Sequence, residues 1–289
     1  MAEVVFSLSR KELINYTINV LRTYNIRPRK RLSQNFVIDP RLIRTILSRV
    51  RKCKPKRILE IGGGIGTLTF YLSDIAEEVI TIEVDKKLIK VLENEIALRK
   101  GNVKVVYGDI LKAYKKLGSF DVIVSNIPYH ISSKILFILT EIKFKEALLT
   151  FQKEFADRLL AKPNEPDYGR LTVMANLYFD IEYLGTYSPS SFYPPPKVYS
   201  TLIDLRRKRI DVNIPIDFFQ DIVRELFTLK NRKLKSAIRN IRFVKNLDDA
   251  KFLELIHELE KYVNRRVRTL SIGELIEIAS TMYRYYKEI

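Results

Sequence analysis

The chain has 289 residues, 46% of them apolar and 29% charged, a composition that excludes a disordered or fibrous protein and suits one large globular domain with a smaller one. Its 51 Lys and Arg residues outnumber 34 Asp and Glu residues, so the net charge is +17 and a polyanionic partner such as nucleic acid is favoured. A cationic surface that serves only solubility is the competing interpretation.

The N-terminal segment is helical and basic. Helical periodicity runs from Arg10 to Tyr24 and from Pro40 to Val50. From Arg22 to Arg57 there are 13 basic residues and one acid, Asp39. Because the charge is clustered, we expect this segment to contact nucleic-acid phosphates. The candidate RNA-binding residues here are Arg29, Lys30 and Arg31.

Short apolar runs alternate with amphipathic stretches from about Arg57 to Gln152, which predicts a doubly wound α/β domain with a parallel sheet and crossover helices. The run from Phe120 to Ser125 is nearly continuous in apolar residues, as expected for a central strand buried on both faces. Helices are expected from Lys86 to Arg99 and from Ile131 to Thr140. The other expected strands are Arg57 to Ile61, Val79 to Glu83, Val103 to Tyr107 and Ala147 to Gln152.

The segment after Gln152 is expected to complete the sheet domain. A helix to Ala161, a polar loop and a helix from Arg170 are predicted to precede two strands, Ile181 to Tyr187 and Val198 to Leu205. The charged stretch from Arg206 to Pro215 predicts a domain boundary, with residues 1–208 before it and residues 209–289 after it.

The C-terminal part has helical periodicity throughout, so a small all-α domain is expected. It contains seven basic residues and no acid between Leu229 and Lys245, a second candidate phosphate-contacting surface. The expected helices are Pro215 to Thr228, Arg232 to Ile241, Asp248 to Tyr262 and Ser271 to Tyr286.

A glycine-rich turn follows the first strand of the sheet, in the sequence Glu60-Ile61-Gly62-Gly63-Gly64-Ile65-Gly66-Thr67. Backbone amides in such a turn approach a ligand closely. The third glycine of the dinucleotide fingerprint is replaced by Thr67, which argues against NAD and against a pyrophosphate. A glycine-rich turn with an acid directly before it is the usual methyltransferase form, and Gly62 and Gly64 are its candidate cofactor contacts.

Two further acids follow strands at the same edge of the sheet. Glu83 ends the second strand and is placed to accept hydrogen bonds from ribose hydroxyls. Asp109, after the third strand, is placed to hold an adenine amine. Each acid alone could be an ordinary cap or turn residue, but together they favour S-adenosylmethionine as the cofactor.

The segment Asn126-Ile127-Pro128-Tyr129 follows the fourth strand, so it should lie beside the glycine turn. Such a segment suits an enzyme that transfers a methyl group to the exocyclic amine of an adenine base. This amine is a poor nucleophile because its lone pair is delocalised into the ring. Two acceptors, the Asn126 side-chain oxygen and the Pro128 carbonyl, suit the task of freeing that lone pair by holding the two amine hydrogens. Tyr129 suits stacking on an unpaired base. An ordinary Asn-x-Pro turn is the alternative.

The sequence contains little that would suit a disulfide, a metal site or a membrane anchor. Cys53 is the only cysteine and His130 and His257 are the only histidines, so no disulfide framework and no metal site are expected. There is no apolar run of about 18 residues and no signal-peptide pattern. A cytoplasmic protein without a membrane anchor is therefore expected, and nothing suggests more than a monomer.

The chain resembles the small-subunit ribosomal RNA adenine dimethyltransferase family, the KsgA type, over nearly its whole length. The matching stretches, beyond the glycine turn, the two acids and Asn126 to Tyr129, are Arg31 to Val37 and Phe192-Tyr193-Pro194-Pro195-Pro196-Lys197-Val198-Tyr199-Ser200. The resemblance implies a class I, Rossmann-like methyltransferase sheet. It also implies transfer of methyl groups to N6 of two adjacent adenosines in the 3′-terminal hairpin of small-subunit ribosomal RNA, with a role in subunit biogenesis.

The resemblance also implies roles for particular residues. Phe192 would face Tyr129 across the target base, although a rigid packed loop explains Phe192 equally well from the residues alone. The helical domain would grip the ribosomal particle. The implied cofactor-binding residues are Gln34, Asn35, Val37, Gly62, Gly64, Glu83, Asp109, Ile110 and Asn126, and the further implied RNA-binding residues are Lys197, Arg232, Lys233, Lys235, Arg239 and Arg242.

Two other functions compete with this expectation. A large-subunit ribosomal RNA adenine methyltransferase of the antibiotic-resistance type would share the cofactor pocket and the Asn126 to Tyr129 segment. The Phe192 to Lys197 stretch and the lysine-rich helical tail favour the small-subunit substrate. A non-catalytic RNA-binding factor on the same fold is disfavoured by the intact Asn126 to Tyr129 segment.

Overall fold

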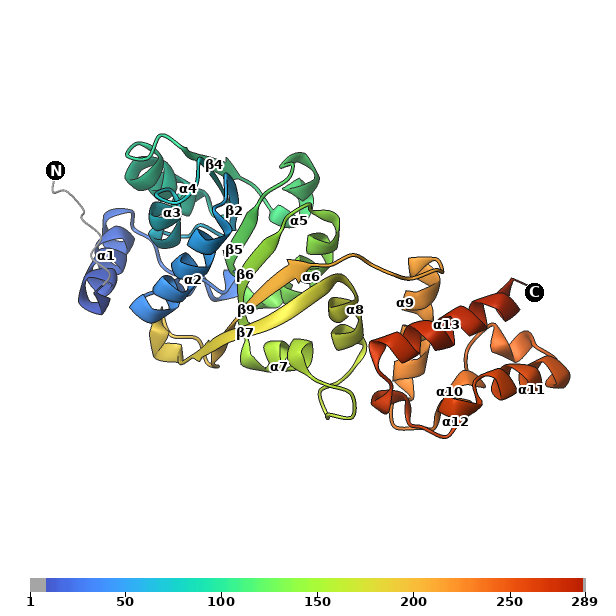
Figure 1. The fold of residues 1–289 in the computed structure, drawn as a ribbon. Helices are drawn as coiled ribbons and strands as arrows, with labels where there is room; N and C mark the ends of the chain where they lie inside the picture. The colour runs from blue at the N-terminus through green and yellow to red at the C-terminus, as the bar shows by residue number, and fades with distance from the viewer. Residues whose placement is uncertain (1–8, 288–289) are drawn as a thin grey trace. The chain divides into compact units, whose positions relative to one another are not determined.

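The computed structural model describes residues 9–287 and contains a seven-stranded sheet of order β4-β3-β2-β5-β6-β9-β7 (Figure 1). The first five strands of this order pair in parallel, and β9 runs antiparallel to β6. This arrangement confirms the predicted α/β fold. The strands are β2 (Arg57–Ile61), β3 (Glu78–Glu83), β4 (Val103–Tyr107), β5 (Val122–Asn126), β6 (Glu146–Gln152), β7 (Phe179–Tyr187) and β9 (Ser200–Arg207).

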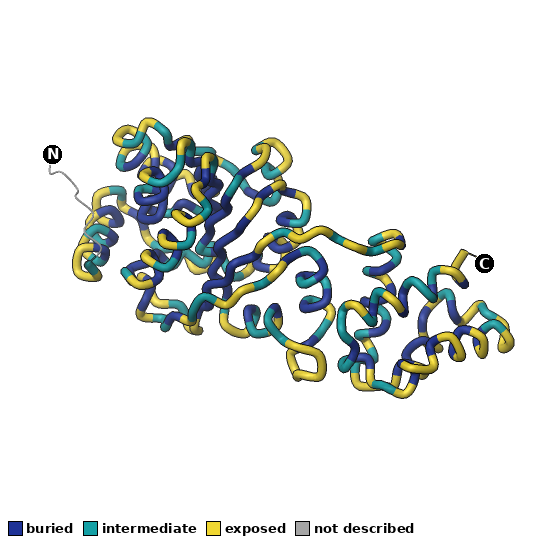
Figure 2. Tube along the Cα trace, viewed as in Figure 1, coloured by how far each residue is buried: buried dark blue, intermediate teal, exposed yellow. Residues whose placement is uncertain are grey.

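The central strand β5 is buried on both faces, as its apolar run predicts. Val122 and Val124 join the core cluster beneath α2, while Ile123, which points to the opposite face, is equally inaccessible. Helices α2 (Pro40–Cys53) and α3 (Thr67–Leu72) lie on one side of the sheet and α5 (Ile110–Ala113) and α6 (Ser132–Glu141) on the other (Figure 1). The inner strands β3, β2, β5, β6 and β9 form a buried centre, whereas the edge strands β4 and β7 are largely half-buried or exposed (Figure 2). Both faces therefore need apolar side chains.

The remaining elements of the sheet region connect the strands or precede them. A short two-stranded sheet pairs β1 (Phe36–Val37) with β8 (Phe192–Tyr193). The expected helix from Lys86 to Arg99 forms as α4 (Lys86–Val91) followed by a π-helical stretch, η2 (Leu92–Ala97). The other helices are α1 (Arg10–Thr23), η1 (Lys30–Leu32), α2 (Pro40–Cys53), α3 (Thr67–Leu72), α5 (Ile110–Ala113), η3 (Tyr114–Lys116), η4 (Tyr129–Ile131), α6 (Ser132–Glu141) and η5 (Pro189–Ser191).

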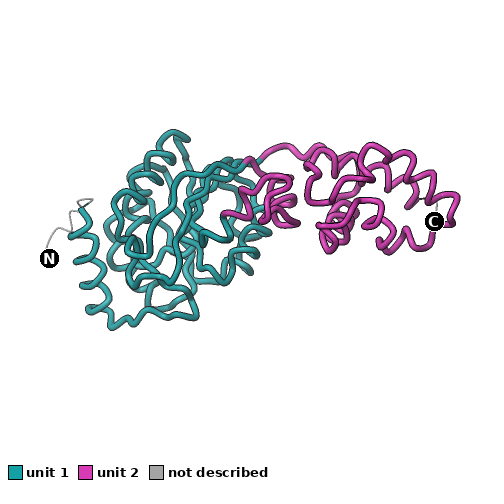
Figure 3. The backbone as a smooth tube through the Cα atoms, turned by 90° about the horizontal axis from the view of Figure 1, so that it is seen from below, with its two compact units in different colours: residues 1–156, 181–207 teal, residues 157–180, 208–289 magenta. Residues whose placement is uncertain are grey.

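The chain divides into two compact units (Figure 3). The first consists of residues 1–156 and 181–207, and the second of residues 157–180 and 208–289. The second junction falls within the charged stretch from which the boundary was expected. Residues 157–180, however, cluster with the helical unit, whereas the sequence pattern assigned them to residues 1–208.

The second unit is helical and has its own core, to which Phe219, Leu234, Leu255 and Met282 contribute. The expected helix from Arg232 to Ile241 is shorter than predicted. Leu234 donates its amide to the carbonyl of Arg265, so the start of the segment forms an isolated β-bridge instead of a helical turn. The helices are α7 (Lys153–Leu160, which spans the first junction), α8 (Arg170–Tyr178), α9 (Ile216–Thr228), α10 (Leu234–Ile238), η6 (Val244–Asn246), α11 (Asp249–Glu258), α12 (Glu260–Val263), η7 (Val267–Thr269) and α13 (Ile272–Tyr286).

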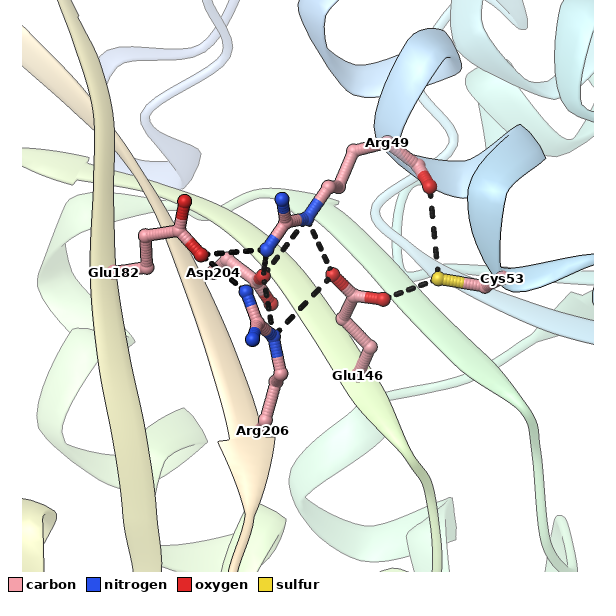
Figure 4. Close-up of polar contacts among 6 residues, drawn as sticks. All are labelled: Arg49, Cys53, Glu146, Glu182, Asp204 and Arg206. Carbon is pink, nitrogen blue, oxygen red and sulfur yellow. Dashed lines mark hydrogen bonds and ion pairs between the residues drawn. The ribbon is translucent and has the colours of Figure 1, made fainter.

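A polar cluster links α2 to β6, β7 and β9 (Figure 4). The Arg49 guanidinium lies 2.7 Å from Glu146 and 2.6 Å from the fully buried Asp204. Arg206 contacts Asp204 and Glu182, and the thiol of Cys53 donates to Glu146. Within residues 9–287, no helix combines the length and the apolar character that crossing a membrane requires.

Candidate functional site

A cavity of about 240 Å³ opens at the carboxyl edge of the sheet, where the strand order reverses between β2 and β5. Open α/β sheets bind their ligands at this kind of switch point. The lining comes from the segment before α2, the glycine turn, and the ends of β3, β4 and β5. All nine residues expected to bind a cofactor contribute to it: Gln34, Asn35, Val37, Gly62, Gly64, Glu83, Asp109, Ile110 and Asn126.

The glycine turn needs glycine for two separate reasons. Gly64 has a φ of +59°, a conformation that residues with a Cβ atom rarely adopt. At Gly63 the limit is space, since a Cβ atom would lie 2.1 Å from the Thr81 hydroxyl oxygen. The turn can therefore pack directly on β3 and leave its backbone at the cavity wall.

Glu83 is oriented by the backbone around it. Its carboxylate accepts hydrogen bonds from the amides of Gly64 at 3.1 Å, Val84 at 2.8 Å and Asp85 at 3.0 Å. Burial raises the pKa of Glu83, while these amides act against the rise. Each carboxylate oxygen has more than one acceptor direction, so acceptor capacity remains for a ligand hydroxyl.

Asp109 serves partly as a helix cap. One carboxylate oxygen accepts from the amide of Leu111 at 3.0 Å and caps α5, which is the ordinary role that the sequence left open. The other oxygen makes no hydrogen bond within the described residues. Capping fixes the side chain in the cavity lining and leaves that second oxygen for a ligand.

Asn126 is held at both ends of its amide. Its nitrogen donates to the backbone carbonyl of Asn35 at 2.7 Å, and its oxygen accepts from the hydroxyl of Thr150 at 2.6 Å. The Pro128 carbonyl, also in the lining, accepts from the amide of Ile131 at 3.0 Å. An sp² oxygen has two acceptor directions, so both proposed acceptors keep one for a substrate.

The two aromatic residues expected at the target base lie outside the cavity lining. Tyr129 is half-buried, and its hydroxyl lies 2.6 Å from that of Ser200. Phe192 is buried in the core, and its backbone pairs with that of Val37. The packed-loop interpretation of Phe192 therefore has direct structural support, and its place opposite Tyr129 stays a prediction.

Gln34 joins the segment before α2 to the turn that follows β3. Its side chain accepts from the backbone amide of Arg29 at 2.8 Å and donates to Asp85 at 2.9 Å.

Asp85 and Thr150 are two residues that the sequence patterns did not single out. Asp85 could have been found as a cap of α4, but Thr150 could not, because its importance depends on how β5 and β6 align.

The candidate RNA-binding residues form separate groups. Arg29 lies 3.5 Å from Asp85, and Lys30 and Arg31 are exposed in η1 at the border of the cavity-lining segment. Lys197 is exposed before β9. Arg239 lies 3.7 Å from Asp249 and over the ring of Phe252. The exposed group on the helical unit is Arg232, Lys233, Lys235, Arg239 and Arg242.

Sequence comparison finds a family match over most of the chain. Residues 25–278 match the family described as ribosomal RNA adenine dimethylase. The chain is 33% identical over 272 residues to the probable ribosomal RNA small subunit methyltransferase A of Methanopyrus kandleri, covering 93% of this chain and 97% of the relative. It is 34% identical over 261 residues to ribosomal RNA small subunit methyltransferase A of Thermotoga petrophila, covering 90% and 94%.

Two solved structures share the fold along most of their length. A dimethyladenosine transferase from Plasmodium falciparum has a TM-score of 0.73 and 29% identity, covering 84% of this chain and 95% of its own. The 23S ribosomal RNA methyltransferase ErmE has a TM-score of 0.64 and 25% identity, covering 86% and 100%. Both are methyltransferases, which agrees with the position of the cavity at the switch point.

Proposed function

The chain belongs to the ribosomal RNA adenine dimethylase family, and on this premise we propose that it transfers methyl groups from S-adenosylmethionine to N6 of two adjacent adenosines in small-subunit ribosomal RNA. The observation that carries the proposal is the position of Asn126. It joins the glycine turn, Glu83 and Asp109 in the lining of one cavity.

The cavity lining fits S-adenosylmethionine in the chemistry of its donors and acceptors. Glu83 suits the ribose hydroxyls, and Asp109 with Ile110 suits the adenine ring. The hydroxyl oxygen of Thr67, also in the lining, is buried without a hydrogen-bond partner among the described residues, as expected for a group that meets a ligand. The turn at Gly62 to Gly64 and the segment from Gln34 to Val37 would enclose the rest.

The proposed mechanism is one of positioning. When bound, the cofactor would supply an electrophilic methyl group on a sulfonium centre. The Asn126 side-chain oxygen and the Pro128 carbonyl each accept one hydrogen of the adenine amine, which directs the nitrogen lone pair out of the ring plane. Tyr129 stacks on a base that has left its helix.

The small-subunit substrate is favoured over the large-subunit one. The curated relatives at 33% and 34% identity carry small-subunit names, while the large-subunit methyltransferase ErmE is 25% identical. The exposed basic residues of the helical unit support a ribosomal partner, which a cytoplasmic enzyme would meet as an immature subunit.

The test uses purified protein, labelled S-adenosylmethionine and small ribosomal subunits that lack the modification. We expect mass spectrometry to find dimethyladenosine at two adjacent positions of the RNA. Large subunits from the same preparation are the control and should stay unmethylated. Absence of methylated adenine in both, with cofactor binding intact, would refute the proposal.

A further inference from the structure

Thr150 contacts the amide of Asn126 from the neighbouring strand. In the parallel pair β5–β6, Thr150 lies opposite Asn126, and its side chain is completely buried. The Thr150 hydroxyl donates to the Asn126 amide oxygen at 2.6 Å. The two backbones thus bring one hydroxyl directly to the atom on which the proposed mechanism depends.

The two ends of the amide have different partners, and the Asn35 carbonyl, which can only accept, decides which end carries the nitrogen. The Asn126 nitrogen donates to the carbonyl of Asn35 at 2.7 Å. Rotating the amide by half a turn would place its oxygen against that carbonyl, acceptor against acceptor. In the observed orientation, Thr150 occupies one acceptor direction of the oxygen and leaves the other available.

We propose that Thr150 is a positioning residue whose hydroxyl holds the Asn126 oxygen in the orientation that accepts a hydrogen from the target amine. The inference rests on the proposed function, because it needs Asn126 to contact the adenine. Thr150 does not line the cavity, so it acts through Asn126. Loss of its hydroxyl should therefore slow methyl transfer and leave cofactor affinity nearly unchanged.

The decisive variants separate the hydroxyl of Thr150 from its methyl group. Thr150→Val keeps the side-chain shape and removes the donor, whereas Thr150→Ser keeps the donor. Thr201→Val is a matched control, because Thr201 is a buried threonine on β9 whose hydroxyl contacts Thr186, 3.0 Å away, and not Asn126. Removal of the Thr201 hydroxyl measures the general effect of losing a buried hydroxyl from this sheet.

The rate of methyl transfer is measured in single turnovers on undermethylated small subunits, with cofactor affinity by calorimetry. We expect Thr150→Val to transfer methyl groups about tenfold more slowly, which is the effect that the loss of one hydrogen bond accounts for. Its cofactor affinity should stay within about twofold of the wild-type value. Thr150→Ser should regain most of the rate, and Thr201→Val should match the wild type. A Thr150→Val rate equal to wild type, or a serine variant as slow as the valine one, would overturn the inference.

A second measurement is independent of activity. The side-chain amide signal of Asn126 in a nitrogen–proton NMR spectrum should shift in Thr150→Val, return in Thr150→Ser and stay in place in Thr201→Val. An unmoved signal in Thr150→Val overturns the inference even if the wild-type protein is inactive. An inactive wild type refutes the proposed function itself, so the two failures are distinguishable.

Discussion

The amide of Asn126 has hydrogen-bond partners on both sides, although the residue ends a strand at the cavity wall. Such a side chain is preorganised, because its orientation does not have to be chosen when substrate arrives. Enzymes gain most from polar groups that are already oriented toward the charge that develops in the reaction. This arrangement supports a catalytic role for Asn126 more strongly than its sequence context alone.

Replacement of Asn126 should separate catalysis from cofactor binding. We expect Asn126→Ala to reduce methyl transfer by at least about a hundredfold, because one of two amine acceptors is lost, while cofactor binding is only partly weakened. Incorporation of labelled methyl groups and calorimetry measure the two effects. Asn94→Ala, at an exposed position of η2, is the control. Unchanged turnover in Asn126→Ala would contradict the role assigned here.

At the scale of elements, the cluster around Arg49 shows how helix α2 is fastened to the sheet. Two guanidinium groups, Arg49 and Arg206, face three carboxyl groups, Glu146, Glu182 and Asp204. The charges balance when Asp204 is protonated. Burial, followed by the neighbouring Glu146, raises the pKa of Asp204 to about 8, which matches that balance.

The raised pKa predicts a dependence of stability on pH. The folded chain retains a proton on Asp204 that the unfolded chain releases above about pH 4. The contribution of Asp204 to the free energy of unfolding is therefore complete below about pH 4, falls as the pH rises towards the folded pKa of about 8, and is lost above it. Although burial acts to raise it, hydrogen bonds with Asp204, Cys53 and Arg49 lower the pKa of Glu146. The contribution of Glu146 to stability is therefore lost as the pH falls.

The variant Asp204→Asn should flatten the decline in stability as the pH rises towards 8. We expect the free energy of unfolding in urea to fall less between pH 6 and pH 9 than in the wild type, since asparagine has no proton to release. Asp221→Asn, which changes an exposed residue paired with Arg224, should retain the wild-type decline. Parallel curves for Asp204→Asn and wild type would exclude the proton on Asp204.

At the scale of the whole molecule, the positive charge is found in both units. The basic residues before α2 belong to the cavity-bearing unit, and those of α10 and its flanks belong to the helical unit. A substrate that contacts both groups would be large and highly charged. This description fits ribosomal RNA within a subunit better than a small molecule.

Neutralising the helical unit should change the salt dependence of binding. In the triple variant Lys233→Gln, Lys235→Gln, Arg239→Gln, we expect weaker binding to the small subunit. The logarithmic salt slope should be smaller by about 0.7 to 0.9 for each phosphate that the variant no longer neutralises. Filter binding between low and high salt measures this slope.

A matched variant removes the same charge elsewhere. Lys104, Lys115 and Lys145 each pair with an acid on the sheet unit, at 2.5 Å, 3.5 Å and 2.8 Å. Their replacement by glutamine should leave the salt slope nearly unchanged. Equal slopes in the helical-unit variant and the wild type would mean that those residues form only a solvated face.

The sequence alone predicted the five parallel strands and the edge of the sheet at which the cavity opens. The ranges of β2 and β4 equal those predicted, because buried parallel strands must be short apolar runs between turns. The lining residues at the ends of the parallel strands follow from the same rule, since parallel strands end at one edge, whereas the lining segment from Gln34 to Val37 was expected only from the family resemblance. Glu83, Asp109 and Asn126 could thus be grouped without coordinates, although their roles stay predictions.

Only the tertiary structure decided what lies beside these residues. Thr150 faces Asn126 because of the register of two strands, Phe192 is buried against the segment before α2, and the β-bridge at Lys233 shortens α10. Each of these interactions joins positions far apart in the chain. Local periodicity reports which face of an element is buried, but the partner on that face is chosen by packing between elements.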